Sequence, residues 1–272
     1  MENMESGRAI NLSEEKETLF ITLYAKALDY HSKHSILNDK AAGDLVKDLN
    51  IDIKKYKGFG SDVMVVRAKQ FDEWIKNFIA INKKATVVYL GCGLDTRILR
   101  INPSFDVNWF DVDYPEVIEL RKKFFDEREG YKMIASSITE SNWINEIPND
   151  KPVLIIAEGV FEYLTEDEVK TLLNRITNHF NDGEIMFDVM NSFGIKSGKE
   201  KLKQTTGAVH KWAVDDVKEV DTLNTKLKRT ENISLYKTQF IKELSFNLRL
   251  ILRLASLSSN FKNMIRLLKY EF

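Results

Sequence analysis

The sequence contains little of what marks several large classes of protein. Its 272 residues include a single cysteine, Cys92, so no internal disulfide can form, and only 4 prolines. Hydrophobic residues make up 43% of the chain, yet they never run on for the roughly 20 positions that a membrane-spanning helix needs. We therefore expect neither a disulfide-rich secreted domain nor an integral membrane protein, and we expect no membrane partner.

An excess of charge of either sign is also missing. The chain has 40 lysine and arginine residues against 41 aspartate and glutamate residues, which gives a net charge of -1. This balance favours neither nucleic acid nor an anionic membrane surface as a partner. Residues 1–17 are polar and acidic and lack the basic and apolar regions of a secretory signal. Together with the single cysteine, this predicts a cytoplasmic location.

The N-terminal part of the chain shows helical periodicity. Apolar side chains recur three and four positions apart in residues 18–33 and again in residues 63–81. We predict that residues 1–82 form a helical cap, which packs on a core formed by residues 83–272. A further helix is predicted to open at Thr165, because Glu168 follows three positions later and completes a capping box.

From residue 86 onward, short apolar runs alternate with amphipathic segments. Five runs are predicted as strands: residues 86–91, 108–112, 131–135, 152–158 and 183–190. This alternation predicts an α/β fold, with a mostly parallel sheet covered by helices on both faces. Residues 232–240 and 264–272 are predicted to bring the sheet to seven strands, the last two forming an antiparallel edge. The stretch between, residues 191–231, starts polar and lysine-rich and is predicted as a cap or loop insertion.

The first predicted strand runs into a turn with two glycines, Gly91 and Gly93, in the sequence LGCGLDTR. In an open parallel sheet, ligands bind beyond the carboxyl ends of the strands, and glycines there let the backbone turn tightly and approach the ligand. A dinucleotide fold has a third glycine where this chain has Thr96, and Asp95 beside it would repel a pyrophosphate. Asp95 is suited to attracting a cation or accepting a hydroxyl hydrogen bond. The alternative is that Asp95 and Thr96 only cap the following helix.

Two further acids stand at the ends of predicted strands. Asp113, 20 positions after Gly93, is placed to accept hydrogen bonds from both hydroxyls of a ribose. Asp111 shares its face of the strand, since side chains alternate along a strand. The alternative is that one of the two aspartates is only a turn residue before Pro115. Glu158 ends an apolar run, where burial is costly unless a ligand ammonium group or Arg67 pairs with it. A ribose acceptor and spare negative charge suit S-adenosylmethionine, which has a sulfonium, an ammonium group and a ribose but no phosphate.

These stretches resemble motifs of the leucine carboxyl methyltransferase family, and more closely those of its bacterial branch of polyketide carboxyl O-methyltransferases. The most specific matches are LGCGLDTR at residues 90–97, FDVDYPEV at residues 110–117 and AEGVFEYLTEDEV at residues 157–169. Comparable stretches in LYAKALDYHS, VVRAKQFD and TTGAVHKW extend the likeness over most of the chain. The resemblance implies a Rossmann-like class I methyltransferase that uses S-adenosyl-L-methionine and releases S-adenosyl-L-homocysteine.

The resemblance also implies cofactor contacts for the matching residues of this chain. Gly91 and Gly93 would lie under the cofactor, and Asp113 would bind its ribose hydroxyls. At the methionine end, Arg67 would bind the carboxylate group, with Lys26 beside it.

Three more positions carry over from the resemblance. Glu158 would lie near the methionine ammonium group, and Tyr163 is a further candidate for the pocket. Ser137, in ASSIT, stands where the family usually has an acid followed by leucine near the adenine. Serine can still accept a hydrogen bond from the adenine amino group, so we expect weaker cofactor affinity rather than none.

Whether the reaction needs a base depends on the acceptor. A carboxylate is already ionised at neutral pH, whereas a phenol or an alcohol would want a base. The best candidate is His210, because histidine titrates near neutrality and the segment TGAVHKW is expected to border the acceptor pocket. The alternative is a surface or packing histidine. We expect no metal site, since His31 and His34 have no further ligands beside them.

The sequence therefore predicts an enzyme, an S-adenosylmethionine-dependent O-methyltransferase. Its acceptor would be a carboxyl or hydroxyl oxygen of a small molecule, such as a polyketide-like or other secondary metabolite. One alternative is a protein C-terminal carboxyl methyltransferase, as in the eukaryotic branch of the family. Another is a non-catalytic module that binds a nucleotide cofactor, although the missing third glycine counts against nicotinamide dinucleotides. The acceptor itself and the oligomeric state are not specified by the sequence.

Overall fold

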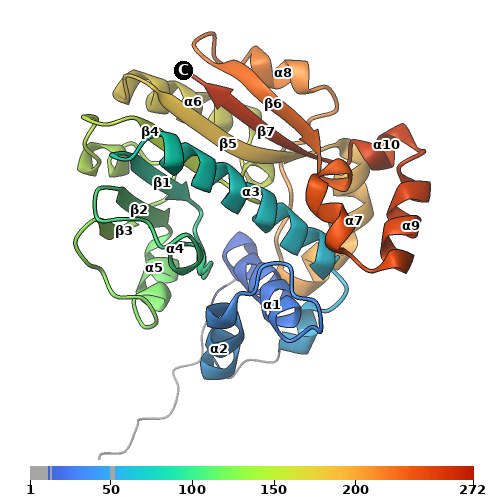
Figure 1. Ribbon diagram of the computed structural model, residues 1–272. Helices are drawn as coiled ribbons and strands as arrows, with labels where there is room; N and C mark the ends of the chain where they lie inside the picture. The colour runs from blue at the N-terminus through green and yellow to red at the C-terminus, as the bar shows by residue number, and fades with distance from the viewer. Residues whose placement is uncertain (1–11, 13, 50–52) are drawn as a thin grey trace, which may run out of the picture.

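A seven-stranded sheet runs through the centre of the computed structural model, which describes residues 12, 14–49 and 53–272 (Figure 1). The strands are β1 Thr86–Leu90, β2 Asn108–Asp113, β3 Tyr131–Ala135, β4 Val153–Ala157, β5 Gly183–Met190, β6 Lys228–Ser234 and β7 Ile265–Glu271. Their order is β3-β2-β1-β4-β5-β7-β6, and β7 runs antiparallel to both of its neighbours. The predicted fold class, α/β with a mostly parallel sheet, is confirmed. Most of the segment that argued against a secretory signal, residues 1–11 and 13, lies outside the described residues.

The first five predicted strands are confirmed, each to within one residue at either end. The strand predicted at residues 232–240 is wrong, because the chain leaves the sheet after Ser234 and forms two short 3-10 helices, η5 (Leu235–Lys237) and η6 (Gln239–Glu243). Strand β6 begins at Lys228, and its side chains alternate between exposed and half-buried, so an apolar run is missing there. The antiparallel edge is confirmed, with β7 on the inside and β6 outermost.

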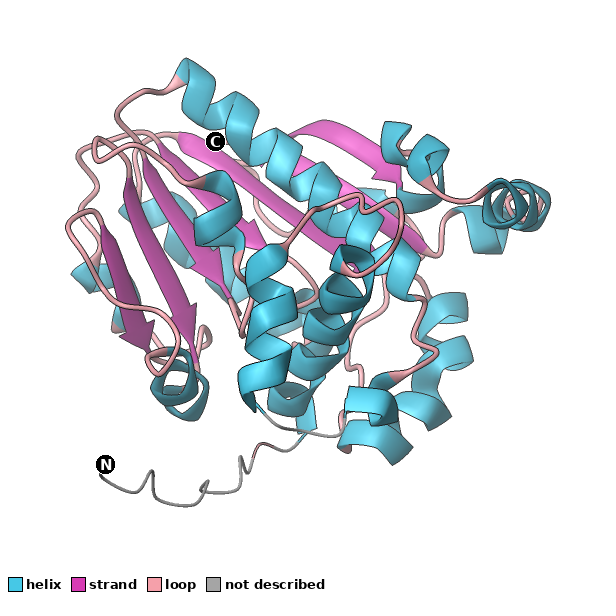
Figure 2. Ribbon diagram, turned by 60° about the horizontal axis from the view of Figure 1, so that its bottom comes forward, coloured by secondary structure: helices cyan, strands magenta, loops and turns pink. Residues whose placement is uncertain are grey.

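Neighbouring residues of the strands belong to two separate hydrophobic layers, one on each face of the sheet. In β1, Val87 lies in the first layer and Val88 in the second. The first face is covered by α3 (Ser61–Ile81), α4 (Arg97–Ile101) and α5 (Pro115–Arg121), and the second by α6 (Glu166–His179) and α8 (Val217–Asp221). Helices thus cover both faces, as predicted (Figure 2). The capping box that opens α6 is also confirmed, with Thr165 and Glu168 each accepting the other's backbone amide.

The described chain before β1 is largely helical. The longer helices α1 (Leu19–Tyr30), α2 (Lys40–Leu49) and α3 pack against one another, with the short helices η1 (Glu14–Thr18) and η2 (Ile53–Tyr56) before and between them. Figure 1 shows α3 lying along the face of the sheet, with α1 and α2 below it in this view. Phe71 and Ile75 of α3 share the hydrophobic layer of Val87. The helical prediction is confirmed for the described residues, and the division into a cap of residues 1–82 and a core of residues 83–272 stays a prediction.

Residues 191–231 were predicted as a cap or loop insertion, and the prediction of a long loop is wrong, because they contain α7 (Ser192–Thr206), α8 and, from Lys228, the start of β6. The side chain of Asn191 accepts the Gly194 N–H at 2.9 Å at the start of α7, and Gly207 ends it with a φ of 83°. Lysines and two internal glycines conceal the helical pattern in the sequence. Gly194 is required by close packing, because a Cβ there would lie 2.6 Å from side-chain atoms of Met190 and of Met264.

Two short helices, α9 (Phe246–Ala255) and α10 (Ser259–Lys262), precede the last strand. Leu252 is buried and faces inward, whereas the larger apolar side chains on the outer side of α9 are exposed: Phe246, Leu250, Ile251 and Leu254. Among the helices of the described residues, none combines the length and the apolar character needed to cross a membrane.

A buried ion pair ties β2 to α5. Asp111 Oδ2 accepts hydrogen bonds from Nε and Nη2 of Arg121 at 2.9 and 2.6 Å, and from the Tyr131 hydroxyl at 2.6 Å. Its Oδ1 accepts the indole N–H of Trp109 at 2.8 Å. Both charged side chains are fully buried. Asp111 is therefore a structural residue, which leaves Asp113 as the aspartate of this strand that a ligand can reach.

The substitution Asp111→Ala is expected to lower the free energy of unfolding by about 3–5 kcal/mol, because it leaves the Arg121 guanidinium buried without its counter-charge. Urea denaturation followed by circular dichroism measures the loss. The control is Lys228→Ala, which breaks an exposed pair with Glu271 at 3.1 Å. That change is expected to cost less than about 1 kcal/mol. Equal losses in the two variants would contradict the role given to Asp111.

Candidate functional site

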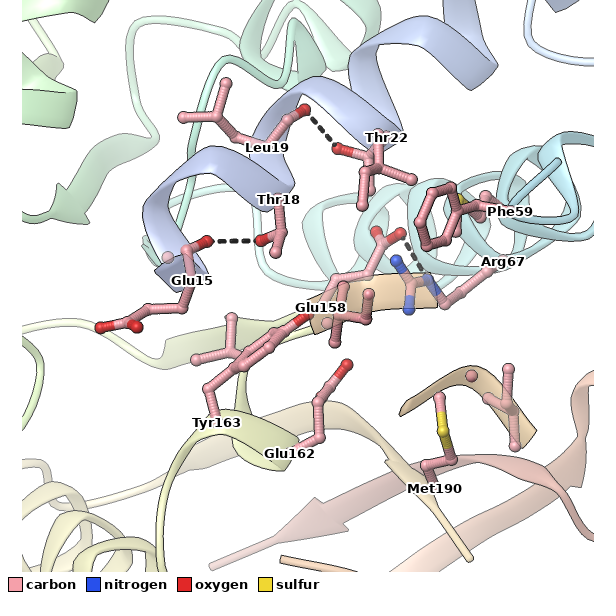
Figure 3. Close-up of a pocket in the computed structure, with 18 of the residues that line it drawn as sticks. Glu15, Thr18, Leu19, Thr22, Phe59, Arg67, Glu158, Glu162, Tyr163 and Met190 are labelled. Atoms are coloured by element: carbon pink, nitrogen blue, oxygen red, sulfur yellow. Dashed lines mark hydrogen bonds and ion pairs between the residues drawn. The ribbon is translucent and has the colours of Figure 1, made fainter. Parts of the chain in front are cut away.

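A cavity of about 540 Å³ opens at the carboxyl ends of β1, β2 and β4, where an open parallel sheet binds its ligands. Helices α1 and α3 contribute to its wall, together with α7 and the short helix η4 (Phe161–Tyr163). Figure 3 shows Arg67 and Glu158 facing Glu162 and Tyr163 across this cavity. The cavity is therefore the candidate active site.

The turn after β1 needs its glycines for two reasons. The backbone is left-handed at Gly91 and Gly93, with φ of 64° and 52°. A Cβ on Gly91 would lie 2.6 Å from Cγ2 of Val160, and one on Gly93 would lie 3.1 Å from Cβ of Leu19. Conformation and space thus both favour glycine here. Thr96, at the start of α4, makes no side-chain capping bond, so the alternative of a simple cap is not supported for this residue.

Asp113, the last residue of β2, is held at this turn by backbone hydrogen bonds. Its Oδ2 accepts the Gly93 N–H and its Oδ1 the Tyr114 N–H, each at 2.7 Å. Burial raises the pKa of Asp113 to about 6, so the carboxylate is largely ionised at neutral pH. Each oxygen has lone-pair capacity for a further hydroxyl. Arg121 supports the turn from behind, donating to the backbone oxygens of Gly93 and Asp95 at 3.0 and 2.7 Å.

Arg97, the first residue of α4, lies at the centre of a buried cluster of ion pairs. Its side chain is fully buried and contacts three carboxylates: Asp72 at 2.8 Å, Asp95 at 3.4 Å and Glu158. These come from α3, from the glycine turn and from the end of β4, so the cluster joins three parts of the fold. Sequence reasoning missed this role, although Arg97 closes the LGCGLDTR motif, because the acids that approach it are distant in the chain.

Asp95 meets cations of the protein itself. Its carboxylate contacts Lys26 and Arg100, both at 2.8 Å, and accepts a hydrogen bond from the Tyr89 hydroxyl at 3.0 Å. Burial by itself would raise the pKa of Asp95, but Arg100, Lys26 and Arg97 hold that pKa well below its usual range. Asp95 is therefore ionised, and its negative charge is offset by neighbouring side chains before any ligand binds.

Arg67 on α3 pairs with two carboxylates, one at the end of β4 and one on β5. Its Nε donates to Glu158 at 2.9 Å and its Nη1 to Asp188 at 2.8 Å. Asp188, on β5, also accepts the Gly159 N–H at 2.7 Å. Of the two partners predicted for Glu158, the structure supplies Arg67. Asp188 was missed because it stands inside an apolar strand, far from Arg67 in the sequence.

Nearly all of the predicted site residues line this one cavity: Lys26, Arg67, Gly91, Gly93, Asp95, Asp113, Glu158, Tyr163 and His210. Ser137 is not brought to the wall. Its hydroxyl pairs with that of Thr139 at 2.8 Å, and its neighbour Ile138 lines the cavity instead. The adenine contact of Ser137 stays a prediction.

The remaining wall is mostly apolar. It is formed by Phe59, Val63, Met64, Met190, Leu202, Leu235, Tyr236, Leu252, Phe261, Met264 and Ile265. These residues come from the segment before α3, from α3, α7, η5, α9 and α10, from the end of β5 and from the start of β7. Sequence analysis did not name them, because only the folded chain brings these segments to one surface.

His210 and Tyr163 lie side by side on the wall, with ring centres 5.1 Å apart. The His210 Nδ1 is buried and has no hydrogen-bond partner among the described residues. Burial lowers the pKa of His210, so the ring is neutral at neutral pH. Its position at the cavity is what a base would require, and the catalytic role itself stays a prediction.

Glu162 is a cavity residue that sequence analysis missed. Its carboxyl group is directed into the cavity between Tyr163 and Met190 (Figure 3). Its Oε2 is buried without a hydrogen-bond partner among the described residues. Burial, followed by the like charge of Asp188, raises the pKa of Glu162 to about 8. A second acid inside AEGVFEYL was the usable signal for this residue, although the direction of its side chain cannot be read from the sequence.

The charges at the cavity fit a cationic ligand without phosphate. In the ion-pair cluster, as far as the described residues show, four cations meet five carboxylates: Lys26, Arg67, Arg97 and Arg100 with Asp39, Asp72, Asp95, Glu158 and Asp188. Each of these cations is engaged by a carboxylate, which leaves little attraction for a pyrophosphate. A sulfonium and an ammonium group would offset the excess negative charge. The described part of the chain holds no group of three or more histidine, cysteine or acidic side chains placed for a metal ion.

Comparison with known proteins identifies relatives along most of the chain. The model of the family "Leucine carboxyl methyltransferase" matches residues 4–177. The tetracenomycin polyketide synthesis O-methyltransferase TcmP of Streptomyces glaucescens is 34% identical, over 87% of this chain and 89% of TcmP. The S-adenosyl-L-methionine-dependent methyltransferase dpfgK of Gibberella zeae is 34% identical, over 82% of this chain and 83% of dpfgK. A solved structure from Thermobifida fusca, described as a methyltransferase, shares the fold with a TM-score of 0.63 over 98% of both chains at 12% identity.

Glu162 is expected to make stability depend on pH. Its pKa is about 8 in the fold against 4.5 as the ordinary value, so the folded state binds the proton more tightly. The free energy of unfolding should therefore fall as pH rises between these two values. Glu162→Gln removes the titration, and we expect the variant to gain on the order of 4 kcal/mol over the wild type from about pH 5 to about pH 9.

Urea denaturation of both proteins across this pH range measures the difference. The control is Glu129→Gln at an exposed position, which should follow the wild type at every pH. A difference between wild type and Glu162→Gln that does not change with pH would contradict the raised pKa.

Proposed function

The chain belongs to the leucine carboxyl methyltransferase family, and from this premise we propose that it transfers a methyl group to an oxygen of an apolar small molecule. It is an enzyme, an S-adenosylmethionine-dependent O-methyltransferase. The observation that carries the proposal is the single cavity in which the glycine turn and Asp113 meet an apolar wall. Such a cavity can hold donor and acceptor side by side, as transfer between two bound molecules requires.

The cofactor would lie along the polar side of the cavity. Gly91 and Gly93 would underlie it without Cβ atoms in the way, and Asp113 would accept hydrogen bonds from the ribose hydroxyls. Bound S-adenosyl-L-methionine supplies a methyl group on a positively charged sulfur. The residues of the chain supply position and electrostatics: they orient the reacting groups and line the space around them.

The methionine end would lie beside Arg67 and Lys26, the roles that the family resemblance implies. Arg67 would share its guanidinium between the cofactor carboxylate and Glu158, and the ammonium group would lie near that glutamate. The adenine end would lie near Ile138, which lines the cavity. Ser137 would reach the adenine only after its hydroxyl leaves Thr139, which supports the expectation of modest cofactor affinity.

The acceptor would occupy the apolar part of the cavity. A polyketide-like or similar secondary metabolite is supported by this wall and by TcmP, whose name places it in tetracenomycin polyketide synthesis. His210 and Glu162 line the cavity, and either can accept a proton. We also propose a cytoplasmic site of action, supported by the single cysteine, Cys92, which is buried.

The substitution Asp113→Ala is expected to weaken binding of S-adenosyl-L-homocysteine by about 100-fold, equivalent to roughly 3 kcal/mol, because two charge-assisted hydrogen bonds to the ribose are lost. Isothermal titration calorimetry measures the affinity. The exposed aspartate Asp126 provides the control, since Asp126→Ala should bind as the wild type does. Absence of binding by the wild type, or undiminished binding by Asp113→Ala, would refute the cofactor site.

The acceptor class is tested with S-adenosyl-L-methionine labelled in its methyl group. We expect label to enter a small-molecule extract of secondary metabolites. Label in a protein or peptide pool instead would favour the alternative of a protein carboxyl methyltransferase, and displacement of S-adenosyl-L-homocysteine by a nicotinamide dinucleotide would favour a nucleotide-binding module.

A further inference from the structure

Helix α9 has an apolar face that no other part of the described chain covers. Its large side chains Phe246, Leu250, Ile251 and Leu254 are 47–70% exposed, and Leu257, just after the helix, is 82% exposed. Apolar residues that are exposed singly are normal on a protein surface, whereas several that lie together mark a surface of contact. Helices α9 and α10 lie at one rim of the molecule, where a partner can reach them (Figure 1).

The spacing of the residues explains why this face is continuous. Positions four apart lie on the same side of a helix, so Phe246, Leu250 and Leu254 form one stripe along α9. Leu252 lies on the opposite side and is buried. Helix α9 is therefore apolar toward the protein and also apolar toward the outside, which a helix that only covers a core does not need.

The charge around α9 is strongly positive, although the whole chain is nearly neutral. Residues 237–262 contain five basic residues and one acidic residue, Glu243. Arg249 and Arg253, again four positions apart, lie beside the apolar stripe. None of the five basic side chains forms an ion pair within the part of the chain that the structure describes. This positive charge favours an anionic partner.

The same charge disfavours a second copy of the chain as the partner. In a two-fold symmetric contact a surface meets itself, so Arg249 and Arg253 of both copies would be brought together. Residues 245–262 contain no acidic residue that would pair with them. Like charges without a counter-charge repel, and their desolvation adds to the cost.

The surface of an anionic lipid bilayer satisfies both features of α9. Apolar side chains of an amphipathic helix are buried at the boundary between headgroups and acyl chains, and basic side chains beside them are attracted to anionic lipids. Arginine suits this arrangement, because its aliphatic stem lies along apolar surface while the guanidinium group reaches the headgroups.

The inner side of α9 favours lipid over an acidic protein as the partner. Leu252 of α9 and Phe261 of α10 both line the apolar wall of the cavity. The same helix thus borders the cavity on one side and the outside on the other. A bilayer dissolves apolar molecules of the kind that this wall fits, and an acidic protein surface does not. This step, unlike the argument from charge, rests on the proposed function.

We propose that α9 binds the surface of an anionic lipid bilayer, with its apolar stripe in the headgroup region and Arg249 and Arg253 on lipid phosphate groups. The contact is with one surface only, because the 10 residues of α9 are about half of what a span needs. The expectation of no membrane partner came from the overall charge and from the length of apolar runs, and neither quantity describes the surface of one folded helix.

Vesicle sedimentation with the full chain tests the proposal. The probes are vesicles of phosphatidylcholine alone and vesicles that also contain phosphatidylglycerol. We expect binding to the anionic vesicles to be at least about tenfold tighter, because each basic residue near the surface adds attraction. We also expect it to weaken when the salt concentration rises from about 0.05 M to about 0.5 M, because salt screens exposed charges.

Two substitutions separate the apolar and the charged contribution. Phe246→Ser is expected to weaken binding to anionic vesicles by about tenfold or more, because an aromatic side chain no longer leaves water. Its matched control is Phe105→Ser, at a phenylalanine that is 77% exposed between α4 and β2. Arg253→Gln is expected to weaken binding about fivefold, with Arg128→Gln, at an exposed arginine before β3, as its control. Both controls should bind as the wild type does.

Four outcomes would overturn the proposal. The first is no binding to anionic vesicles, and the second is an equal loss in Phe246→Ser and Phe105→Ser. The third is a dimer in sedimentation velocity that Phe246→Ser dissociates, without vesicle binding, which would assign the face to a second copy. The fourth is binding of poly-L-glutamate, lost in Arg253→Gln, again without vesicle binding, which would assign it to an acidic protein.

The affinity for S-adenosyl-L-homocysteine, measured by calorimetry, shows that each variant is folded. It should equal that of the wild type, because none of the substituted residues lines the cavity. If Phe246→Ser does not fold, Leu257→Ser outside the helix tests the same face, and vesicle binding that it leaves unchanged would contradict the proposal. Failure of the proposed function differs from this, since the wild type itself would then not bind S-adenosyl-L-homocysteine, whatever it does with vesicles.

Discussion

The buried ion-pair cluster around Arg97 is the constraint on which the rest of this site depends. A charge removed from water is stable only with partners at short distance, so each guanidinium and carboxylate of the cluster restrains the others. Its members come from α1, α3 and α4, from the residue before α2, from the glycine turn and from β4 and β5. The N-terminal helices are thereby bound to the same edge of the sheet that carries the glycine turn, and the cavity exists because they are bound there.

The cluster also divides the acids of the cavity into two kinds. Asp95 and Glu158 have depressed pKa values, because burial is outweighed by Arg97 and the neighbouring cations. Asp113 and Glu162 have raised pKa values, because burial prevails where no cation contacts the carboxylate directly. The first kind holds the fold together. The second kind lines the cavity, Asp113 beside the glycine turn and Glu162 beside Tyr163.

Local patterns accounted for much of the fold. The first five strands, the capping box of α6 and the glycine turn are each determined by residues close together in the chain, so periodicity and turn chemistry predicted them. Prediction failed where packing outweighs local preference. In α7, Gly194 lowers helical propensity but is required by the side chains of Met190 and Met264. In β6, pairing with β7 holds a polar segment in the sheet, while the apolar residues beyond Ser234 turn away from it.

The sequence by itself determined the family, the cofactor class and the residues at the ends of the strands, because the motif from Gly91 to Arg97 and the acids Asp113 and Glu158 stand at recognisable distances from apolar runs. Tertiary structure alone decided what each acid does. The cations that hold Asp95 ionised and the acids that keep Glu162 protonated approach from other helices and strands. A carboxyl group's pKa depends on charges within a few ångströms and on burial, and neither quantity is encoded in its sequence neighbours.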